Sequence, residues 1–509
     1  MDFKSRAMKT IKSTILIFTI CITTTLFNAC KKVEPSTAID EKEALSNEAD
    51  ISTATIGTYA VLRNPEYVRS GHFLTEYRGD NIAQGQPSSD DLSRCYRYTQ
   101  IATGAHATAF WSQAYHLIVG ANKIIAAIPD NASADLKQLK GENIYLRAMV
   151  EFNLVRIFGR PYPQNNGNNP GVPLLNENST DAAPARSTVK QVYDAVIADL
   201  LKAADLMTVA KSNIYASKEV AYALLSRVYL YMNDNANAIK YADLVINSGR
   251  YTLLQGGAYS GYFSGVPEDN TETIFCIRYT KTQDEGFSAI GSMYYSGLGP
   301  DGTAPITTPG GQGNTGWGEI YASKTYVEDL DKYPADLRHS FIAPYTIDGV
   351  LQMNKKLTPN TPMYYITKYS FQEGLVTLSS PVYLRLAEMF LNKAEANAKL
   401  GNAQLALNDV NVIRTRAGIP TLTLSDVAGG DVLGAVLEER RLEFAFEGQR
   451  AYDLFRNNLP LVRNYPGTHS LNNTPNTNTL QTILPTDPRV VFYIPQVEID
   501  NNPKLTQNP

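Results

Sequence analysis

The sequence is poor in the residues that most often build metal and redox sites. Its 509 residues include only four Cys and five His, and the His form neither an HExxH motif nor a close pair. Cys95 and Cys276 are the two Cys outside the N-terminal segment, and neither has a CxxC partner. Two buried free thiols are favoured over a disulfide, although pairing in an oxidising compartment stays open. We therefore expect no metal and no cofactor.

A surplus of one charge sign is also missing. Lys and Arg number 46 against 50 Asp and Glu, which gives a formal net charge of −4. A general nucleic-acid binder normally has a basic surplus, so nucleic acid is not an expected partner. With 43% hydrophobic and 19% charged residues, the chain can fill a large core. Its length allows two to four ordinary domains or one large repeat assembly.

No segment after the N-terminus has an uninterrupted apolar run long enough to span a bilayer, and the N-terminal run itself is short. Residues 14–27 are uncharged and follow a Lys/Arg-rich start, but a spanning helix needs about 20 residues. The run leads into Leu26-Phe27-Asn28-Ala29-Cys30, which resembles a bacterial lipobox, with Phe27 where Leu is usual. We predict a signal peptide over 1–29, lipid on Cys30 and a polar tether over 30–50. Several acyl chains give a stable anchor, so the protein should sit on a membrane.

Apolar residues at helical spacing dominate the chain from about residue 107 onward. The run over 110–128 should end at Pro129, and 134–158 is apolar on two sides, as in a helix packed between neighbours. Thr188-Val-Lys-Gln191 is a capping box that starts another helix. Residues 221–247 and 386–414 share a helix–turn–helix pattern with small residues at matching places, which is typical of tetratricopeptide-like (TPR-like) hairpins.

The segment 251–380 differs from the helical parts on both sides. It holds 13 of the 31 Tyr and 16 of the 34 Gly, with short strand-like pieces at 272–279 and 364–369. Long irregular segments in compact proteins are usually functional. We predict a mostly α fold: a TPR-like helical-repeat scaffold with a large irregular, short-strand insertion. The helical regions are 51–250 and 381–509, and 251–380 is the candidate ligand region.

The search for a catalytic site returns one charged constellation, at 437–456. The sequence has no GxSxG motif and no Walker loop. Glu439, Glu443 and Glu447 share a helical face, and two Glu could act as the acid and base of a glycoside hydrolase. Arg residues interleave with them, and like charges one turn apart repel unless a cation lies between. A structural ion network is therefore favoured, and we expect no enzyme, with hydrolysis at Glu443 or Glu447 as an alternative.

Several sequence blocks stand in order along nearly the whole mature chain. They are FWSQAYHLIVGANKII (110–125), GENIYLRAMVEFNLVRIFGRPYP (141–163), RSTVKQVYDAVIADLLKAADLM (186–207), PVYLRLAEMFLNKAEANAKLG (381–401), IRTRAGIP (413–420) and ERRLEFAFEGQRAYDLFR (439–456). The last block is followed by the C-terminal ending FYIPQVEIDNNPKLTQNP. Together, these blocks and this ending resemble the SusD/RagB family of outer-membrane lipoproteins.

The resemblance implies a function in nutrient uptake. It implies a lipoprotein anchored in the outer membrane, facing the cell exterior, which captures a nutrient and delivers it to a TonB-dependent transporter of the SusC type. The nutrient in this family is most often a glycan, so an oligosaccharide ligand is expected. A structural lid of the transporter, with little ligand affinity of its own, is the alternative. Because the chain has only two Trp, smaller or decorated glycans and even a peptide stay open as ligands.

Candidate ligand residues follow from the chemistry of sugars, which have apolar ring faces and a rim of hydroxyls. Trp317 is the strongest candidate, because Gly316 and Gly318 leave its ring little local cover. Tyrosines in Gly-rich loops could also expose their rings, and the alternative is that several of them pack the loops against the helices. EYRGDN (76–81) supplies polar groups. The further candidates are Tyr259, Tyr262, Tyr294, Tyr295, Arg78, Asp80 and Asn81.

Overall fold

The helical repeats and the insertion were examined in a computed structural model. It describes residues 44–84, 90–294, 320–347, 349–354, 361–469 and 480–509. The chain separates into two units, Met1–Asp50 and Ile51–Pro509. Of the first unit only residues 44–50 are described, so the predicted signal peptide, Cys30 and most of the tether lie outside the described residues. All sites discussed below belong to the second unit.

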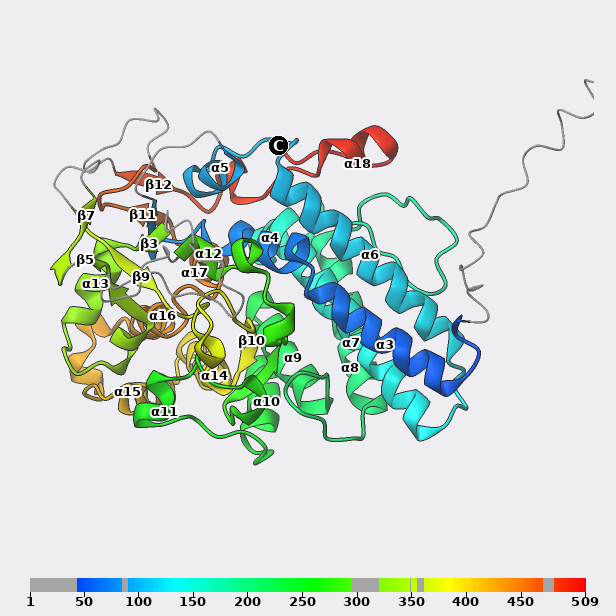
Figure 1. The fold of residues 1–509 in the computed structure, drawn as a ribbon, viewed down its shortest axis with the longest axis horizontal. Helices are drawn as coiled ribbons and strands as arrows, with labels where there is room; N and C mark the ends of the chain where they lie inside the picture. Colours follow the sequence, from blue (N-terminus) through cyan, green and yellow to red (C-terminus); the bar gives the residue numbers. More distant parts are fainter. Residues whose placement is uncertain (1–43, 85–89, 295–319, 348, 355–360, 470–479) are drawn as a thin grey trace, which may run out of the picture. The chain divides into compact units, whose positions relative to one another are not determined.

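Long antiparallel helices form the first half of the chain (Figure 1). Helix α4 packs on α6, α6 on α7, α7 on α8 and α8 on α9. As expected, α6 ends just before Pro129, and the Thr188 side chain and Gln191 form a capping box at the start of α8. The helices are α3 (Glu48–Leu62), α4 (Pro65–Glu76), α5 (Asp91–Arg97), α6 (Ala105–Ala127), α7 (Ala134–Phe158), α8 (Val189–Leu206), α9 (Lys218–Met232) and α10 (Asn235–Ile246).

The two predicted helical hairpins stack on each other although the insertion separates them in sequence. Helix α10 of the first hairpin packs on α14 (Leu386–Lys399), which packs in turn on α15 (Ala403–Ala417). Helix α16 (Val432–Glu443) lies against both α14 and α15, and α17 (Arg450–Arg456) follows. The helical scaffold therefore closes around the insertion, which confirms the predicted fold class.

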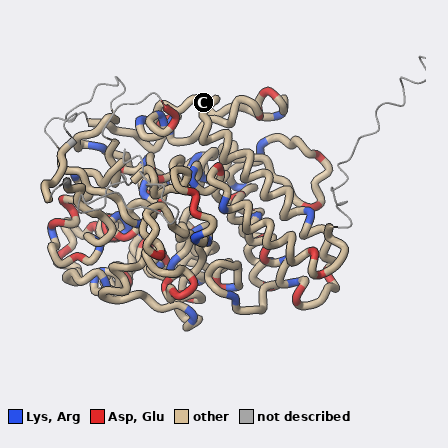
Figure 2. Tube along the Cα trace, viewed as in Figure 1, with Lys and Arg blue, Asp and Glu red and all other residues tan. Residues whose placement is uncertain are grey.

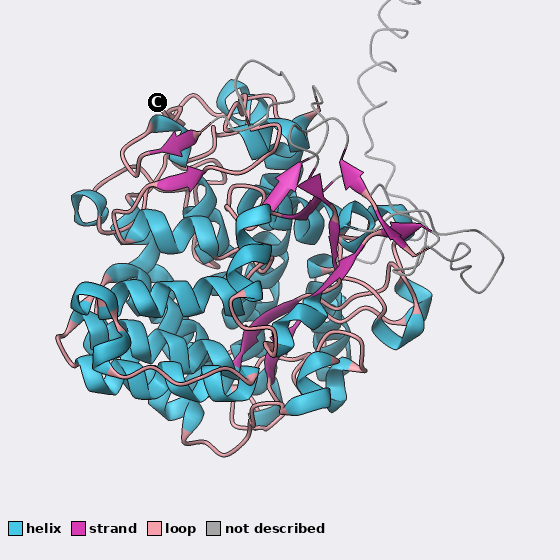
Figure 3. Cartoon of the chain, turned by 90° about the vertical axis from the view of Figure 1, so that its left-hand side faces the viewer, coloured by secondary structure: helices cyan, strands magenta, loops and turns pink. Residues whose placement is uncertain are grey.

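The insertion holds short helices and two-stranded antiparallel ribbons, which Figure 3 shows in magenta beside the helices. Both predicted strand pieces are present, as β2 and β9. Strand β2 pairs with β10, which leads directly into α14, so this ribbon joins the insertion to the second hairpin. The elements are α11 (Gly256–Ser260), β2 (Thr273–Cys276), α12 (Gly291–Tyr294), β3 (Ile320–Ala322), α13 (Lys324–Asp331), β4 (Ile342–Pro344), β5 (Thr346–Ile347), β6 (Val350–Leu351), β7 (Met353–Asn354), β8 (Thr361–Pro362), β9 (Tyr364–Ile366) and β10 (Val382–Arg385).

Two further ribbons and one short helix complete the fold. Strand β1 (Ile82–Gln84) pairs with β3, and β11 (Leu461–Arg463) pairs with β12 (Gln481–Ile483). Helix α18 (Gln496–Asn501) lies near the C-terminus. One large core runs from Tyr59 to Leu505 and includes both faces of α7, as its two apolar stripes predict.

Charge and hydropathy of the described chain agree with the sequence analysis. Acidic and basic residues are interspersed along the trace, and neither sign dominates one part (Figure 2). None of the described helices combines the length and the apolar character that a membrane span requires. Cys95 and Cys276 are both free and buried, as favoured above.

Candidate functional site

A groove of about 280 Å³ lies inside the insertion, beside α11 and the 3₁₀ turn Leu337–Phe341. Three phenylalanine rings line it together with five hydroxyl side chains, and none of its lining residues carries a charge. We call it the phenylalanine groove. Its lining residues are Ser260, Phe263, Ser264, Ser340, Phe341, Ala343, Thr367, Ser370 and Phe371.

The rings of the groove are held from beneath by other aromatic side chains. Phe341 meets Phe263 edge-on, with 5.2 Å between ring centroids, and Tyr259 meets Phe341 in the same way at 5.3 Å. Tyr262 packs against Phe263 at 4.6 Å. The buried Lys368 ammonium lies 5.0 Å from the Phe341 centroid, which adds a cation–π contact. The groove floor is therefore a preformed aromatic layer.

Two details mark the groove as more than a packing irregularity. Phe371 has a backbone φ of 65°, a left-handed conformation that is a genuine outlier for a bulky residue and whose cost the surrounding fold must bear. The Ser370 hydroxyl is buried and has no hydrogen-bond partner among the described residues. Buried polar groups are normally paired, so this unpaired hydroxyl is an exception beside the groove.

Three other hydroxyls of the groove, those of Ser264, Ser340 and Thr367, donate their hydrogens to backbone carbonyls. Ser340 donates to the Leu337 carbonyl at 2.7 Å, and Thr367 donates to the Ser340 carbonyl at 3.0 Å. Each oxygen keeps lone pairs for a further bond. Aromatic faces, acceptor oxygens and the absence of charge suit an uncharged ring that carries hydroxyl groups.

Three predicted ligand tyrosines are buried, in contrast to the expectation that their rings face outward. Tyr259 donates to Glu443 at 3.0 Å, and the Arg416 guanidinium lies 3.7 Å from its ring centroid. Tyr262 bonds Thr273 at 2.8 Å, and Tyr294 bonds His72 at 2.5 Å. Each hydroxyl has found a partner inside the protein, which is how large amphipathic rings become core residues. Tyr259 and Tyr262 support the groove, and a direct ligand contact by any of the three stays a prediction.

The polar candidates before β1 are buried as well. Arg78 lies between the rings of Tyr98 and Phe492, at 4.5 and 4.7 Å. Asp80 pairs with Arg450 at 2.8 Å; burial disfavours its charge, but Arg450 and Arg441 lower its pKa to about 2. The Asn81 side-chain oxygen accepts from Arg441 at 3.0 Å. These side chains fasten the start of the insertion's first ribbon to the C-terminal helices, and their role toward a ligand stays a prediction.

Tyr295, Trp317 and Cys30 lie outside the described residues. Their assignments as ligand contacts and as the lipidated residue remain predictions. The described chain resumes at Ile320, whose register partner in the β1–β3 ribbon is Gln84.

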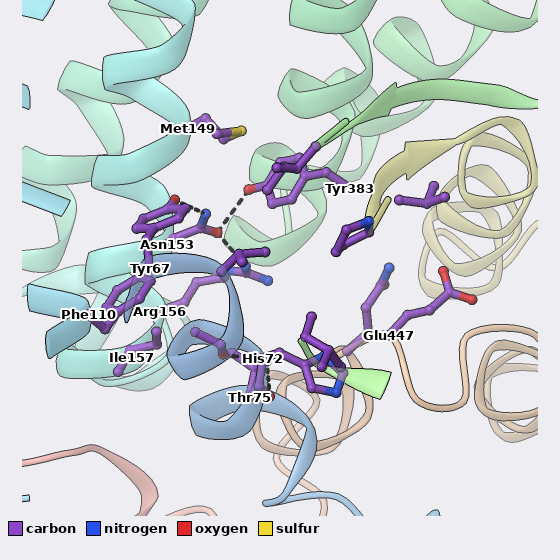
Figure 4. Close-up of a pocket in the computed structure, with 18 of the residues that line it drawn as sticks. Tyr67, His72, Thr75, Phe110, Met149, Asn153, Arg156, Ile157, Tyr383 and Glu447 are labelled. Carbon is purple, nitrogen blue, oxygen red and sulfur yellow. Dashed lines mark hydrogen bonds between the residues drawn. The ribbon is translucent and has the colours of Figure 1, made fainter. Parts of the chain in front are cut away.

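A second cavity, of about 110 Å³, lies where α4, α6, α7, α9 and β10 meet (Figure 4). Tyr67, Asn153 and Tyr383 form a hydrogen-bonded chain along one wall, and Arg156 donates into it. We call it the Arg156 cavity. Its lining also includes Val68, Gly71, His72, Thr75, Phe110, Met149, Ile157, Arg227, Ile277, Ile290, Tyr369, Pro381, Val382, Glu447, Gly448 and Gln449.

Burial sets the protonation of two groups at this cavity. It lowers the pKa of His72 to about 3, so this imidazole is neutral at pH 7. It raises the pKa of Glu76, which follows the lining residue Thr75, to about 8, although the Gly448 amide donates to that carboxyl at 2.7 Å. Neither group therefore contributes a full charge at neutral pH.

The acidic constellation is a structural ion network, as favoured above. Glu443 is fully buried and accepts from Arg385 and Arg416, and Glu439 pairs with Arg338 at 2.6 Å. Burial raises the pKa of Glu443, but Arg416, Arg385 and Arg338 together hold it well below its usual range. A general acid in glycoside hydrolysis needs the opposite shift. Among the described residues no group of three His, Cys, Asp or Glu side chains could hold a metal ion.

The lining residues of both cavities were missed by sequence reasoning. Phe263, Phe341 and Phe371 lie in the predicted ligand region, and their signal was available: Phe263 directly follows Tyr262, inside a Gly-rich loop. Arg156 lies within a block that reads as a core helix, so its position on a cavity has no local signal.

Comparison with known proteins gives consistent matches over most of the chain. A sequence model described as "SusD family" matches residues 344–509, and one described as "Starch-binding associating with outer membrane" matches 32–230. SusD-like protein P38 of Formosa agariphila is 26% identical, over 98% of this chain and 99% of its own length. A SusD superfamily crystal structure from Bacteroides thetaiotaomicron is 27% identical, with a TM-score of 0.76 over 91% of this chain and 100% of that one.

A laminarin binding SusD-like protein has the same fold. Its TM-score is 0.66 at 23% identity, over 91% of this chain and 99% of that one. The fold thus defines a helical-repeat protein of TPR-like architecture with an irregular insertion, a class that these solved structures share. Within this class, the chain is similar to proteins of the SusD family over most of its length.

Proposed function

We propose that this protein is an outer-membrane lipoprotein that binds a neutral oligosaccharide and delivers it to a partner TonB-dependent transporter of the SusC type. The observation that carries the proposal is similarity to the SusD family along most of the chain, including the match to a model described as "Starch-binding associating with outer membrane". The lipobox around Cys30 supports anchoring at that membrane, with the protein facing the cell exterior.

The phenylalanine groove supports a neutral carbohydrate as the ligand. Sugar rings have apolar faces that pack on aromatic side chains, and Phe263, Phe341 and Phe371 offer three rings in one place. The surrounding hydroxyl oxygens can accept from sugar hydroxyls, and no lining charge favours an ionic ligand. Trp317 and Tyr295 are kept as further stacking residues of the same insertion.

The proposed role is binding and not catalysis. The buried Glu443 and its arginines favour a permanently ionised, structural carboxylate over a proton donor. Hydrolysis of a bound glycan is therefore not expected. A transporter partner follows from the family resemblance, and co-purification of a TonB-dependent barrel from native membranes in mild detergent would support it.

The alternative, a transporter lid with little ligand affinity, is favoured by one observation. Tyr259, Tyr262 and Tyr294 are candidate ligand contacts in the sequence analysis, but their side chains are buried in the core. A binding survey separates the two functions.

The survey screens the full-length lipoprotein, in mild detergent, against a panel of neutral and acidic oligosaccharides by calorimetry. Capture of at least one neutral glycan with saturable affinity is expected. Trp317→Ala should weaken that binding at least several-fold, because stacking on one aromatic ring contributes on the order of 1 to 3 kcal/mol, by analogy with nucleic-acid bases. Binding to no glycan of the panel would favour the lid function instead.

A further inference from the structure

We propose that the Arg156 cavity is a binding site for an oxyanion, such as the carboxylate of an acidic sugar or a free sulfate. Arg156 lies near the end of α7, and Figure 4 shows its side chain reaching into the cavity, between Asn153 and Tyr383 on one side and His72 on the other. This site goes beyond the proposed capture of neutral glycans and does not depend on it.

The Arg156 guanidinium has no carboxylate partner within ion-pair distance in the described part of the chain. Its one hydrogen bond there runs from Nη2 to the Asn153 side-chain oxygen at 2.6 Å, and its buried Nε has no partner. Arginines buried in proteins are usually paired, because an isolated cation is costly to desolvate. Arg78 and Arg463 are also buried without a carboxylate partner in the described part of the chain, but both donate to backbone carbonyls, whereas the one bond of Arg156 goes to a neutral side-chain amide.

Aromatic rings stabilise the Arg156 cation but do not neutralise it. The guanidinium carbon lies 4.9 Å from the ring centroids of Phe152 and Tyr452 and 5.8 Å from that of Tyr231. Such contacts occupy the faces of a guanidinium and leave the N–H groups at its edge free for a planar anion. The aromatic rings thus hold the Arg156 guanidinium group in one orientation.

The other charged groups of the cavity are already balanced. Arg227 forms two bonds of 2.6 Å with Glu388, and Glu447 pairs with Lys368 at 2.6 Å and with Arg385 at 2.9 Å. His72 is neutral at pH 7 because it is buried. A positive charge at Arg156 therefore remains, and an anion would neutralise it.

A second donor stands beside Arg156. The Asn153 amide is shared among three partners: its oxygen accepts from Arg156 and from the Tyr383 hydroxyl at 2.9 Å, and its nitrogen donates one of its two hydrogens to the Tyr67 oxygen at 3.1 Å. The Tyr67 hydroxyl thus accepts one bond, and no described residue accepts from it, so its own hydrogen is left to donate. A guanidinium and a phenol held by one amide can bind an oxyanion together.

The cavity is large enough for one small anionic group. Its volume of about 110 Å³ compares with the roughly 150 Å³ of a cavity that holds a single six-membered ring. A carboxylate with part of its sugar ring, or a sulfate, fits these limits, whereas a long glycan does not. The site would thus recognise the negative charge of a terminal sugar or of a side group on a glycan.

The test uses the full-length lipoprotein in mild detergent and four probes in calorimetric titrations. Sodium glucuronate is compared with glucose, which has the same ring without the carboxylate, and sodium sulfate is compared with sodium chloride at equal ionic strength. The wild-type protein should bind glucuronate or sulfate and not the matched control. Competition between the two anions identifies a general oxyanion site, and binding of glucuronate alone identifies a sugar-carboxylate site.

Three variants connect the binding to Arg156. Arg156→Gln should weaken anion binding at least tenfold, and Arg156→Lys should retain part of it. Arg489→Gln removes a charge from a half-exposed arginine paired with Asp487 at 2.7 Å, and it should bind like the wild type. If Arg156→Gln does not fold, the Arg156→Lys titration and the wild-type comparison still decide. Wild-type protein that prefers neither anion to its control, or an unchanged affinity in Arg156→Gln, would overturn the proposal.

Discussion

At the residue scale, polar groups of the interior are arranged in chains that join distant parts of the sequence. Glu443 of α16 meets Arg385 of β10 and Arg416 of α15, and it also accepts from Tyr259 of the insertion. Breaking one member of such a network leaves the other charges buried without partners, which costs more than the net contribution of the intact pairs. The network fixes the insertion to the scaffold.

Glu443→Gln should therefore lower the free energy of unfolding by about 3 to 5 kcal/mol. Urea denaturation followed by circular dichroism measures this change. Glu438→Gln is the matched control, since its side chain is 45% exposed and 3.6 Å from Arg441, and it should shift stability by less than about 0.5 kcal/mol. Equal, small effects of both substitutions would contradict the network. Loss of glycan hydrolysis in a fully stable Glu443→Gln protein would restore the enzyme alternative.

Glu76 gives the stability a pH dependence. Its pKa in the folded protein is raised to about 8, mainly by burial, and the folded state therefore holds its proton more tightly than the unfolded state. The stabilisation is complete below the unfolded pKa and is lost as pH rises towards 8, by up to about 1.4 kcal/mol per pH unit.

In Glu76→Gln this part of the pH dependence should disappear between pH 5 and 8. The amide keeps the acceptor for the Gly448 N–H and cannot ionise. Denaturation midpoints across this range measure the slope, with Glu328→Gln on exposed α13 as the control that should leave it unchanged. A slope in Glu76→Gln as steep as that of the wild type would show that Glu76 is ionised in the folded protein.

At the scale of elements, α7 is a central helix with buried residues on both of its faces. It packs on α6 on one side and α8 on the other, and it carries Asn153 and Arg156 into the second cavity. Close approach to α8 depends on Gly141, because a Cβ there would lie 2.7 Å from Met207 Cγ and 3.1 Å from Leu206 Cβ. Gly120 on α6 is different, since a Cβ added to it meets nothing within 4 Å.

These two helical glycines should respond to alanine in opposite directions. Gly141→Ala should destabilise the protein by about 1 to 3 kcal/mol through overpacking. Gly120→Ala should stabilise it by about 0.5 to 1 kcal/mol, because alanine is the better helix former. Urea midpoints of the two variants and the wild type test this. A shift in the same direction for both would mean that α7 and α8 are not packed as closely as described.

The elements that could be predicted from sequence are those with local signals. Pro129 ends α6, Thr188 and Gln191 cap α8, and the spacing of small residues identified both hairpins. The β11–β12 ribbon has no such local signal, because strands of three residues are too short to show an alternating pattern.

The site was harder to predict because its determinants are not local. Tyr259 forms a hydrogen bond with Glu443, which lies 184 residues away in the sequence. Tyr294 forms one with His72, which lies 222 residues away. A Gly-rich loop around a tyrosine gives no sign of such a partner, so the sequence alone does not separate a ring exposed for a ligand from one packed against the helices. The phenylalanine groove lies within 251–380, and the role of this region toward a ligand stays a prediction.

At the scale of the whole molecule, we propose that a lipid on Cys30 anchors the ligand-binding part of the chain at the outer membrane. Cys30→Ala should abolish lipidation and release the protein from the outer membrane into a soluble fraction, because no other acylated residue is predicted. Fractionation of cells with an immunoblot measures the distribution. A variant that stays membrane-bound after a high-salt wash would contradict the lipobox assignment.

We propose that the glycan binds in the phenylalanine groove. Phe371→Ala keeps a non-glycine residue in the same left-handed conformation and removes a ring from the groove. Phe287→Ala is the matched control, because Phe287 is 45% exposed and does not line the groove.

The most direct test is calorimetric titration of the best neutral oligosaccharide from the survey into the wild type and these two variants. The account predicts that Phe371→Ala weakens binding at least several-fold without a large change in melting temperature, and that Phe287→Ala binds like the wild type. Unchanged affinity in Phe371→Ala, with the same glycan bound by the wild type, would contradict the placement of the ligand in the groove.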